Sequence, residues 1–172
     1  MSSLNKNTFI RSLMFYLPTL FLFLSVLNEI DFNYLEIEYF SFNFVYILIF
    51  YWTLKNPHYL SYGSIFIAGL VNDVVTGLPI GISSLCYLLI CAVTAYLRNI
   101  TLTPNFMNDW LSLLFTILLV NSIQVMSLDL IFSIDVNYMR YSINSGFTFV
   151  FYPLFLFLFN NLEKKIKTQK ND

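Results

Sequence analysis

Charged residues are scarce in this chain. Asp, Glu, Lys and Arg make up 11% of the 172 residues, roughly half the share usual in a soluble domain, and hydrophobic residues make up 58%. A chain of this composition belongs in a lipid bilayer. No polar linker or low-complexity tract is long enough to divide it, so we expect residues 1–172 to form one integral membrane domain.

Residue patterns that carry chemistry are also lacking. His58 is the sole histidine, which excludes a metal site built from several imidazoles. We find no serine placed beside an activating histidine, no glycine-rich phosphate loop after a strand and no metal-ligand spacing. We therefore expect no catalytic residues, no metal, no cofactor and no nucleic-acid partner. Cys86 and Cys91 lie in an apolar segment, where we expect them to be two small buried hydrophobes.

The apolar residues gather in six segments. They cover residues 10–28, 40–54, 61–76, 81–97, 110–133 and 143–160. A spanning helix needs roughly 20 apolar residues, so the second segment is short unless it begins near Leu35. The pattern predicts an all-α membrane protein with six transmembrane helices. Trp52 and Trp110 fall near the ends of two segments, where indole rings often anchor helices at the membrane interface.

Charges between the segments predict the orientation. The connection between the first two segments has no Lys or Arg and contains four acidic residues: Glu29, Asp31, Glu36 and Glu38. If both termini are cytoplasmic, eight of the nine basic residues lie inside and only Arg140 lies outside. The positive-inside rule expects this asymmetry, and six crossings return the tail to the side where the chain began. We therefore predict that both termini are cytoplasmic.

The stretch GLVNDVVTGLPIG, Gly69 to Gly81, combines a carboxylate with helix-breaking residues. Asp73 lies in an otherwise apolar run, and Gly77, Pro79 and Gly81 predict a tight outward-facing connection between two helices. Gly69 is a small residue of the kind that lets membrane helices approach closely. Two interpretations of Asp73 stay open. It reaches a polar group of a neighbouring helix and fixes packing, or it faces a cavity or a partner helix.

The fifth segment carries a second polar set. Asn121 and Gln124 are three residues apart and share a helix face, whereas Asp129 lies off to the side. These side chains form interhelical hydrogen bonds, or they form the polar wall of a central pocket to which Asp73 also contributes.

The stretch from Gly69 to Gly81 resembles a signature of the MreD family of rod shape-determining proteins. The resemblance implies a six-helix protein of the bacterial inner membrane, with a bundle and a shallow pocket similar to those of vitamin-transporter S components. It implies association with an MreC-like bitopic protein and with MreB, near RodA and a penicillin-binding transpeptidase. The family supplies no catalytic residues.

Two functions follow as hypotheses. The first is a non-enzymatic scaffold of the cell-elongation and peptidoglycan-synthesis machinery, as the resemblance implies. The second is a small-molecule-binding membrane subunit similar to a transporter S component, with Asp73 and Asn121 touching the ligand. In either case we expect six residues to line the partner surface or the pocket: Asp73, Gly77, Pro79, Gly81, Asn121 and Gln124.

Overall fold

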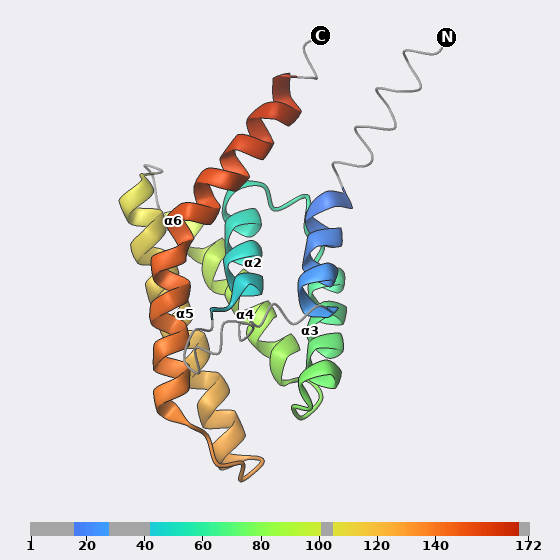
Figure 1. Cartoon of the computed structure of the whole chain (residues 1–172), viewed down its shortest axis with the longest axis vertical. Coiled ribbons are helices and arrows are strands. Elements are labelled where there is room, and N and C mark those ends of the chain that lie inside the picture. Colours follow the sequence, from blue (N-terminus) through green and yellow to red (C-terminus); the bar gives the residue numbers. More distant parts are fainter. Residues whose placement is uncertain (1–15, 28–41, 101–104, 169–172) are drawn as a thin grey trace, which may run out of the picture.

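The computed structural model describes residues 16–27, 42–100 and 105–168. Within these ranges the chain forms six helices and no strand, which confirms the all-α prediction (Figure 1). The helices are an N-terminal helix at Tyr16–Leu27, α2 at Phe44–Lys55, α3 at Tyr62–Thr76, α4 at Ile82–Ile100, α5 at Phe106–Leu130 and α6 at Tyr138–Thr168. Each predicted apolar segment overlaps one of them, and α2, α4, α5 and α6 extend beyond the predicted bounds. The predicted early start near Leu35 lies outside the described residues.

The helices differ in length. By length and composition α4, α5 and the Tyr138–Asn161 part of α6 can cross a membrane, so the chain is a membrane protein. α2 has 12 residues and α3 has 15. At about 1.5 Å per residue they measure about 18 and 22 Å, less than the roughly 30 Å of a hydrocarbon core. Crossing by all six helices stays a prediction.

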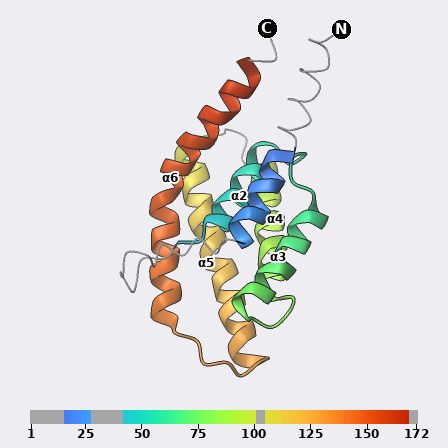
Figure 2. The same cartoon turned by 45° about the vertical axis from the view of Figure 1, so that its right-hand side comes forward.

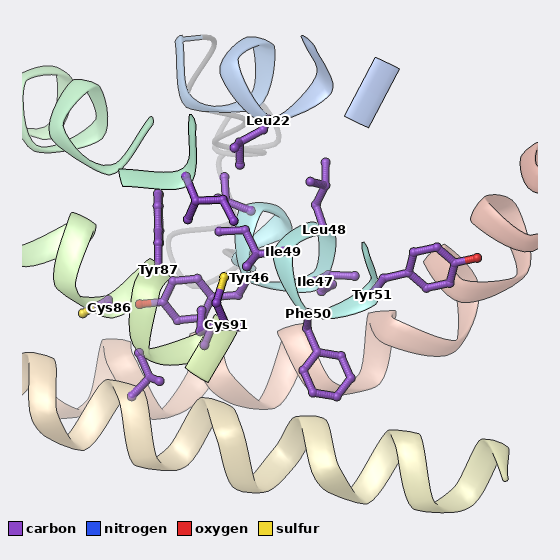
Figure 3. Close-up of a cluster of buried hydrophobic side chains, with 14 of the residues drawn as sticks. Leu22, Tyr46, Ile47, Leu48, Ile49, Phe50, Tyr51, Cys86, Tyr87 and Cys91 are labelled. Atoms are coloured by element: carbon purple, nitrogen blue, oxygen red, sulfur yellow. The ribbon is translucent and has the colours of Figure 1, made fainter. Parts of the chain in front are cut away.

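α2 is the centre of the bundle. All of its residues from Val45 to Thr53 are buried, and it packs against α4, α5 and α6. A helix that is apolar all round is buried on every side, as expected from its uniformly apolar sequence. Figure 3 shows Ile47, Ile49 and Phe50 pointing from α2 in different directions into the core. The same view places Cys86 and Cys91 in this core, and both are buried free thiols, which confirms their predicted role.

Successive helices run in alternating directions, so the connections lie at two ends (Figures 1 and 2). The α2–α3 connection, the last residues of α4 and the last residues of α6 lie at one end. We call this the basic end, because it carries Lys55 and Arg98. The α3–α4 and α5–α6 connections lie at the other, which we call the opposite end.

Polar contacts hold helices together at the basic end. Lys55 of α2 forms a 2.8 Å ion pair with Asp109 of α5. Glu163 of α6 accepts hydrogen bonds from the Tyr51 hydroxyl at 3.3 Å and the Asn56 amide at 3.2 Å. The central helix is thereby tied to α5 and α6.

The prediction for Trp52 is wrong. Its side chain is 5% exposed and packs edge-on against the rings of Tyr51 and Tyr59 instead of lying at an interface. Trp110 is half-buried, stacks on Phe149 and donates its indole N–H to the Phe149 carbonyl at 3.0 Å. Both indoles therefore contribute to packing between helices.

Candidate functional site

Close contact between α3 and α4 depends on Gly69. A Cβ atom built on this residue would lie 2.4 Å from the Cα atom of Ser84. Backbone atoms cannot move aside as the tip of a flexible side chain can, so a larger residue at position 69 would push the helices apart. The Ser84 hydroxyl donates a 3.0 Å hydrogen bond to the carbonyl of Phe66 across the same contact. The expectation of a close helix approach at Gly69 is met.

Asp73 caps the helix that follows it. Its side chain is fully buried, and its two oxygens accept the backbone N–H groups of Gly81 at 2.7 Å and Ser83 at 2.8 Å. The first N–H groups of a helix have no partner inside the helix, and the helix dipole places partial positive charge there. A carboxylate satisfies both demands. Asp73 therefore does for α4 what an N-cap residue does, although it lies on the preceding helix.

The chain reverses between Asp73 and Gly81 through two glycines. Gly77 ends α3 with φ of +70°, and Gly81 precedes α4 with φ of +106°, a region that other residues adopt at a cost. The carbonyl of Asp73 accepts the Leu78 N–H at 3.0 Å, and the carbonyl of Pro79 accepts the Ile82 N–H at 3.3 Å. The turn is therefore fixed by backbone conformation at both ends.

A pocket of about 360 Å³ lies at the N-terminus of α2. Six of its lining residues carry an amide or guanidinium side chain: Asn43, Asn72, Asn121, Gln124, Arg140 and Asn144. They come from α3, α5, α6 and the residue that caps α2. No Asp or Glu is among the described lining residues. The wall of this pocket therefore offers amide donors and acceptors and one guanidinium.

The structure brings Asn121 and Gln124 together on this wall. The Asn121 amide also donates to the Ser145 hydroxyl at 2.7 Å, and the Gln124 carbonyl oxygen accepts from the Tyr46 hydroxyl at 3.1 Å. Asn121 and Gln124 therefore make interhelical hydrogen bonds and also line the pocket, but the second alternative is not met in full, because it included Asp73. In contrast, Asp73, Gly77, Pro79 and Gly81 are not among the described residues that line the pocket.

Four of the six amide and guanidinium residues that line the pocket were missed by the sequence reasoning: Asn43, Asn72, Arg140 and Asn144. Asn72 lines the pocket and donates to the Ser83 hydroxyl at 2.9 Å, and in the sequence its signal is weaker than the charge of its neighbour Asp73. Arg140 was noted only as the one basic residue on the predicted outer side. The sequence signal for Arg140 was that it is the one basic residue in a connection predicted to face outward. Within the described ranges, no three His, Cys, Asp or Glu side chains gather as metal ligands would.

Taken together, the helices and the site define an all-helical membrane protein in which the interior polar side chains mostly bind one another. Residues 9–162 match the family described as rod shape-determining protein MreD, and because this is most of the chain, the protein belongs to the MreD family. The family implies a role in rod-shape determination. Comparison with curated proteins and with solved structures finds no match.

Proposed function

We propose that the chain is a non-enzymatic scaffold of the cell-elongation machinery in the bacterial inner (cytoplasmic) membrane. In this proposal it forms a single domain that crosses the membrane six times, with the basic end and both termini in the cytoplasm. Family membership supports the link to cell shape. The charge asymmetry of the sequence supports the orientation.

The observation that carries the proposal is that the carboxylates packed between the helices, one in the α3–α4 hairpin and two at the basic end, are bound within the fold. Carboxylates within a membrane bundle usually mark substrate or proton pathways. Here Asp73 binds two backbone N–H groups of α4, Asp109 pairs with Lys55, and Glu163 binds two side chains around α2. Each has a partner within the fold. This arrangement supports a protein that offers a rigid folded surface and not a reaction centre.

The outer faces of the long helices are free for contacts. Of the most apolar 18-residue stretch of α6, 22% is buried inside the bundle, against 33% for α5 and 44% for α4. Large apolar side chains such as Val150, Leu154 and Phe157 point outward from α6. Because lipid tails are as apolar as these side chains, helix association in a membrane depends on packing and hydrogen bonds. We propose that such faces meet membrane lipids and the partners that the family resemblance implies: an MreC-like bitopic protein, RodA and a penicillin-binding transpeptidase, with MreB at the basic end.

A pull-down of the tagged chain from native membranes, with mass spectrometry of proteins and lipids, tests this function. We expect an MreC-like bitopic protein and wall-synthesis enzymes in the eluate. Recovery of transporter components alone would contradict the scaffold. A variant with alanine at Leu154 and Phe157 and a matched variant with alanine at Phe115 and Leu118 change exposed faces of α6 and α5. We expect at least one of them to lose a partner without loss of folding.

Asp73→Asn is a weak test of docking by itself. Its carboxylate binds the first N–H groups of α4, so the substitution changes the α3–α4 hairpin itself and not only a surface that a partner could contact. Loss of a partner from this variant would be informative only where the hairpin remains folded. The exposed-face variants avoid this difficulty, because their side chains make little contact with the interior.

A further inference from the structure

The pocket arises from the shortness of α2. With 12 residues, α2 is about 18 Å long, whereas α5 with 25 residues is about 37 Å long. α2 begins partway along the bundle, and α3, α5 and α6 continue past its first residue toward the opposite end (Figure 1). The pocket occupies the space at this N-terminus, where Asn43, Phe44 and Val45 line it.

The helix start supplies backbone donors to the pocket. The side chain of Asn43 caps α2 by accepting the N–H of Tyr46 at 3.2 Å. The N–H groups of Phe44 and Val45 belong to the same first turn, where a helix offers no internal partner. A helix N-terminus of this kind favours anions, phosphate groups among them.

Gln124 of α5 supplies a second donor to the pocket, independent of the start of α2. It is 8% exposed and lines the pocket, and its carbonyl oxygen is already bound to the Tyr46 hydroxyl. Its amide NH₂ has no hydrogen-bond partner in the described part of the chain. In the described ranges the fully buried side-chain atoms without a partner are Thr94 Oγ1 and Tyr152 Oη, so the Gln124 NH₂ is accessible from the pocket and can donate to a ligand acceptor.

Arg140 adds positive charge. It is exposed, it lines the pocket, and its guanidinium forms no ion pair with any residue in the described ranges. Tyr87 and Tyr141 are the other titratable side chains among the described lining residues. The guanidinium, the Gln124 amide and the helix start offer several donors, which suits the several oxygens of a phosphate group.

We propose that this pocket binds the phosphate group of a small molecule. In this proposal Arg140, Gln124 and the first turn of α2 hold the phosphate group. The apolar part of the same molecule contacts Phe42, Phe44 and Leu78. A volume of about 360 Å³ lies near the lower limit of the roughly 300–1,000 Å³ typical of small-molecule sites. An anionic phospholipid and a soluble phosphate compound share this chemistry. The site is independent of the proposed scaffold function, so failure of either leaves the other standing.

Binding to the full chain in detergent micelles tests the site. Isothermal titration calorimetry compares inorganic phosphate, short-chain phosphatidylglycerol and phosphatidylcholine of the same chain length. We expect saturable binding of phosphate or phosphatidylglycerol, weakened about tenfold or more by Arg140→Gln and by Gln124→Leu, because each variant removes a charge-assisted hydrogen bond to the phosphate. Arg140→Lys keeps the charge and should bind at an intermediate level. Asp135→Asn changes an exposed charge outside the pocket and should bind as the unaltered chain does.

The probes separate the two sources. Binding of phosphatidylglycerol without binding of inorganic phosphate supports a lipid, and inorganic phosphate that competes with the lipid supports a soluble compound. Equal binding of phosphatidylcholine, no saturable binding of either anion, or unchanged affinity in Arg140→Gln would each overturn the proposal. Arg140 is exposed, so its variants decide the matter even if Gln124→Leu disturbs Tyr46.

Discussion

Replacing Asp73 by Asn should loosen the α3–α4 hairpin while keeping the shape of the side chain. The carboxylate accepts two backbone N–H groups at 2.7 and 2.8 Å and is fully buried. Asn offers one oxygen, so one N–H loses its acceptor and faces an amide NH₂. An unsatisfied buried donor costs about 1–3 kcal/mol, and the remaining bond loses its charge assistance. We expect a total loss of about 2–4 kcal/mol, within the range for a broken buried hydrogen-bond network.

The two cysteines provide the assay. Cys86 and Cys91 both lie on α4 and are buried, so a thiol-reactive fluorescent maleimide labels them only when this region opens. A loss of 2 kcal/mol corresponds to an increase of about 30-fold in the opened population and in the labelling rate. Asp129→Asn is the matched control, since Asp129 is exposed and has one long contact of 3.4 Å with Tyr138. Equal labelling rates in the two variants would refute the capping role of Asp73.

Three further predictions concern stability, measured by the same labelling during thermal unfolding. Gly69→Ala should destabilise the chain strongly, because the added Cβ would lie 2.4 Å from the α4 backbone. Gly63→Ala is the matched control. The nearest atom to its added Cβ is 3.8 Å away, so this variant should be neutral or stabilising by up to about 1 kcal/mol. Gly81→Ala should cost about 1–2 kcal/mol through its φ of +106° alone, since no atom lies within 4 Å of the added methyl group. Asp109→Asn should destabilise the basic end more than the double variant that also replaces Lys55 by Met, because the single change leaves a half-buried ammonium without its 2.8 Å partner. Equal effects of the single and double variants would show that the pair is not coupled.

The sequence was sufficient to predict the helices, because each is a long apolar run bounded by polar or helix-breaking residues. It was also sufficient to predict the turn after Asp73, where Gly77 and Gly81 adopt the positive φ values that glycine permits. The partner of Asp73 is close in sequence, and an acidic residue shortly before the start of the next helix is a signal that could have predicted the cap. The family resemblance at this stretch is confirmed by the match over residues 9–162.

Contacts between distant segments could not be predicted in the same way. The ion pair of Lys55 with Asp109 joins residues 54 positions apart, and it depends on how α2 and α5 are rotated against each other. The pocket depends on the rotation of several helices and on the short length of α2, so neither Asn72 nor Arg140 could be assigned to it from spacing alone. Trp52 was misplaced for the same reason. Its position near a helix end suggested an interface, but the neighbouring helices bury Trp52 there, while Lys55 at the end of the same turn is exposed.

Site-specific photo-crosslinking in native membranes tests the scaffold most directly. A photoreactive side chain is placed at Leu154 or Phe157 on α6 and at Phe115 or Leu118 on α5, all of which are exposed, and at Ile49 of the buried α2 as a control. The scaffold predicts that at least one exposed face crosslinks to another cell-elongation protein, while Ile49 crosslinks only within the chain. Adducts with lipid alone at every exposed position would contradict it.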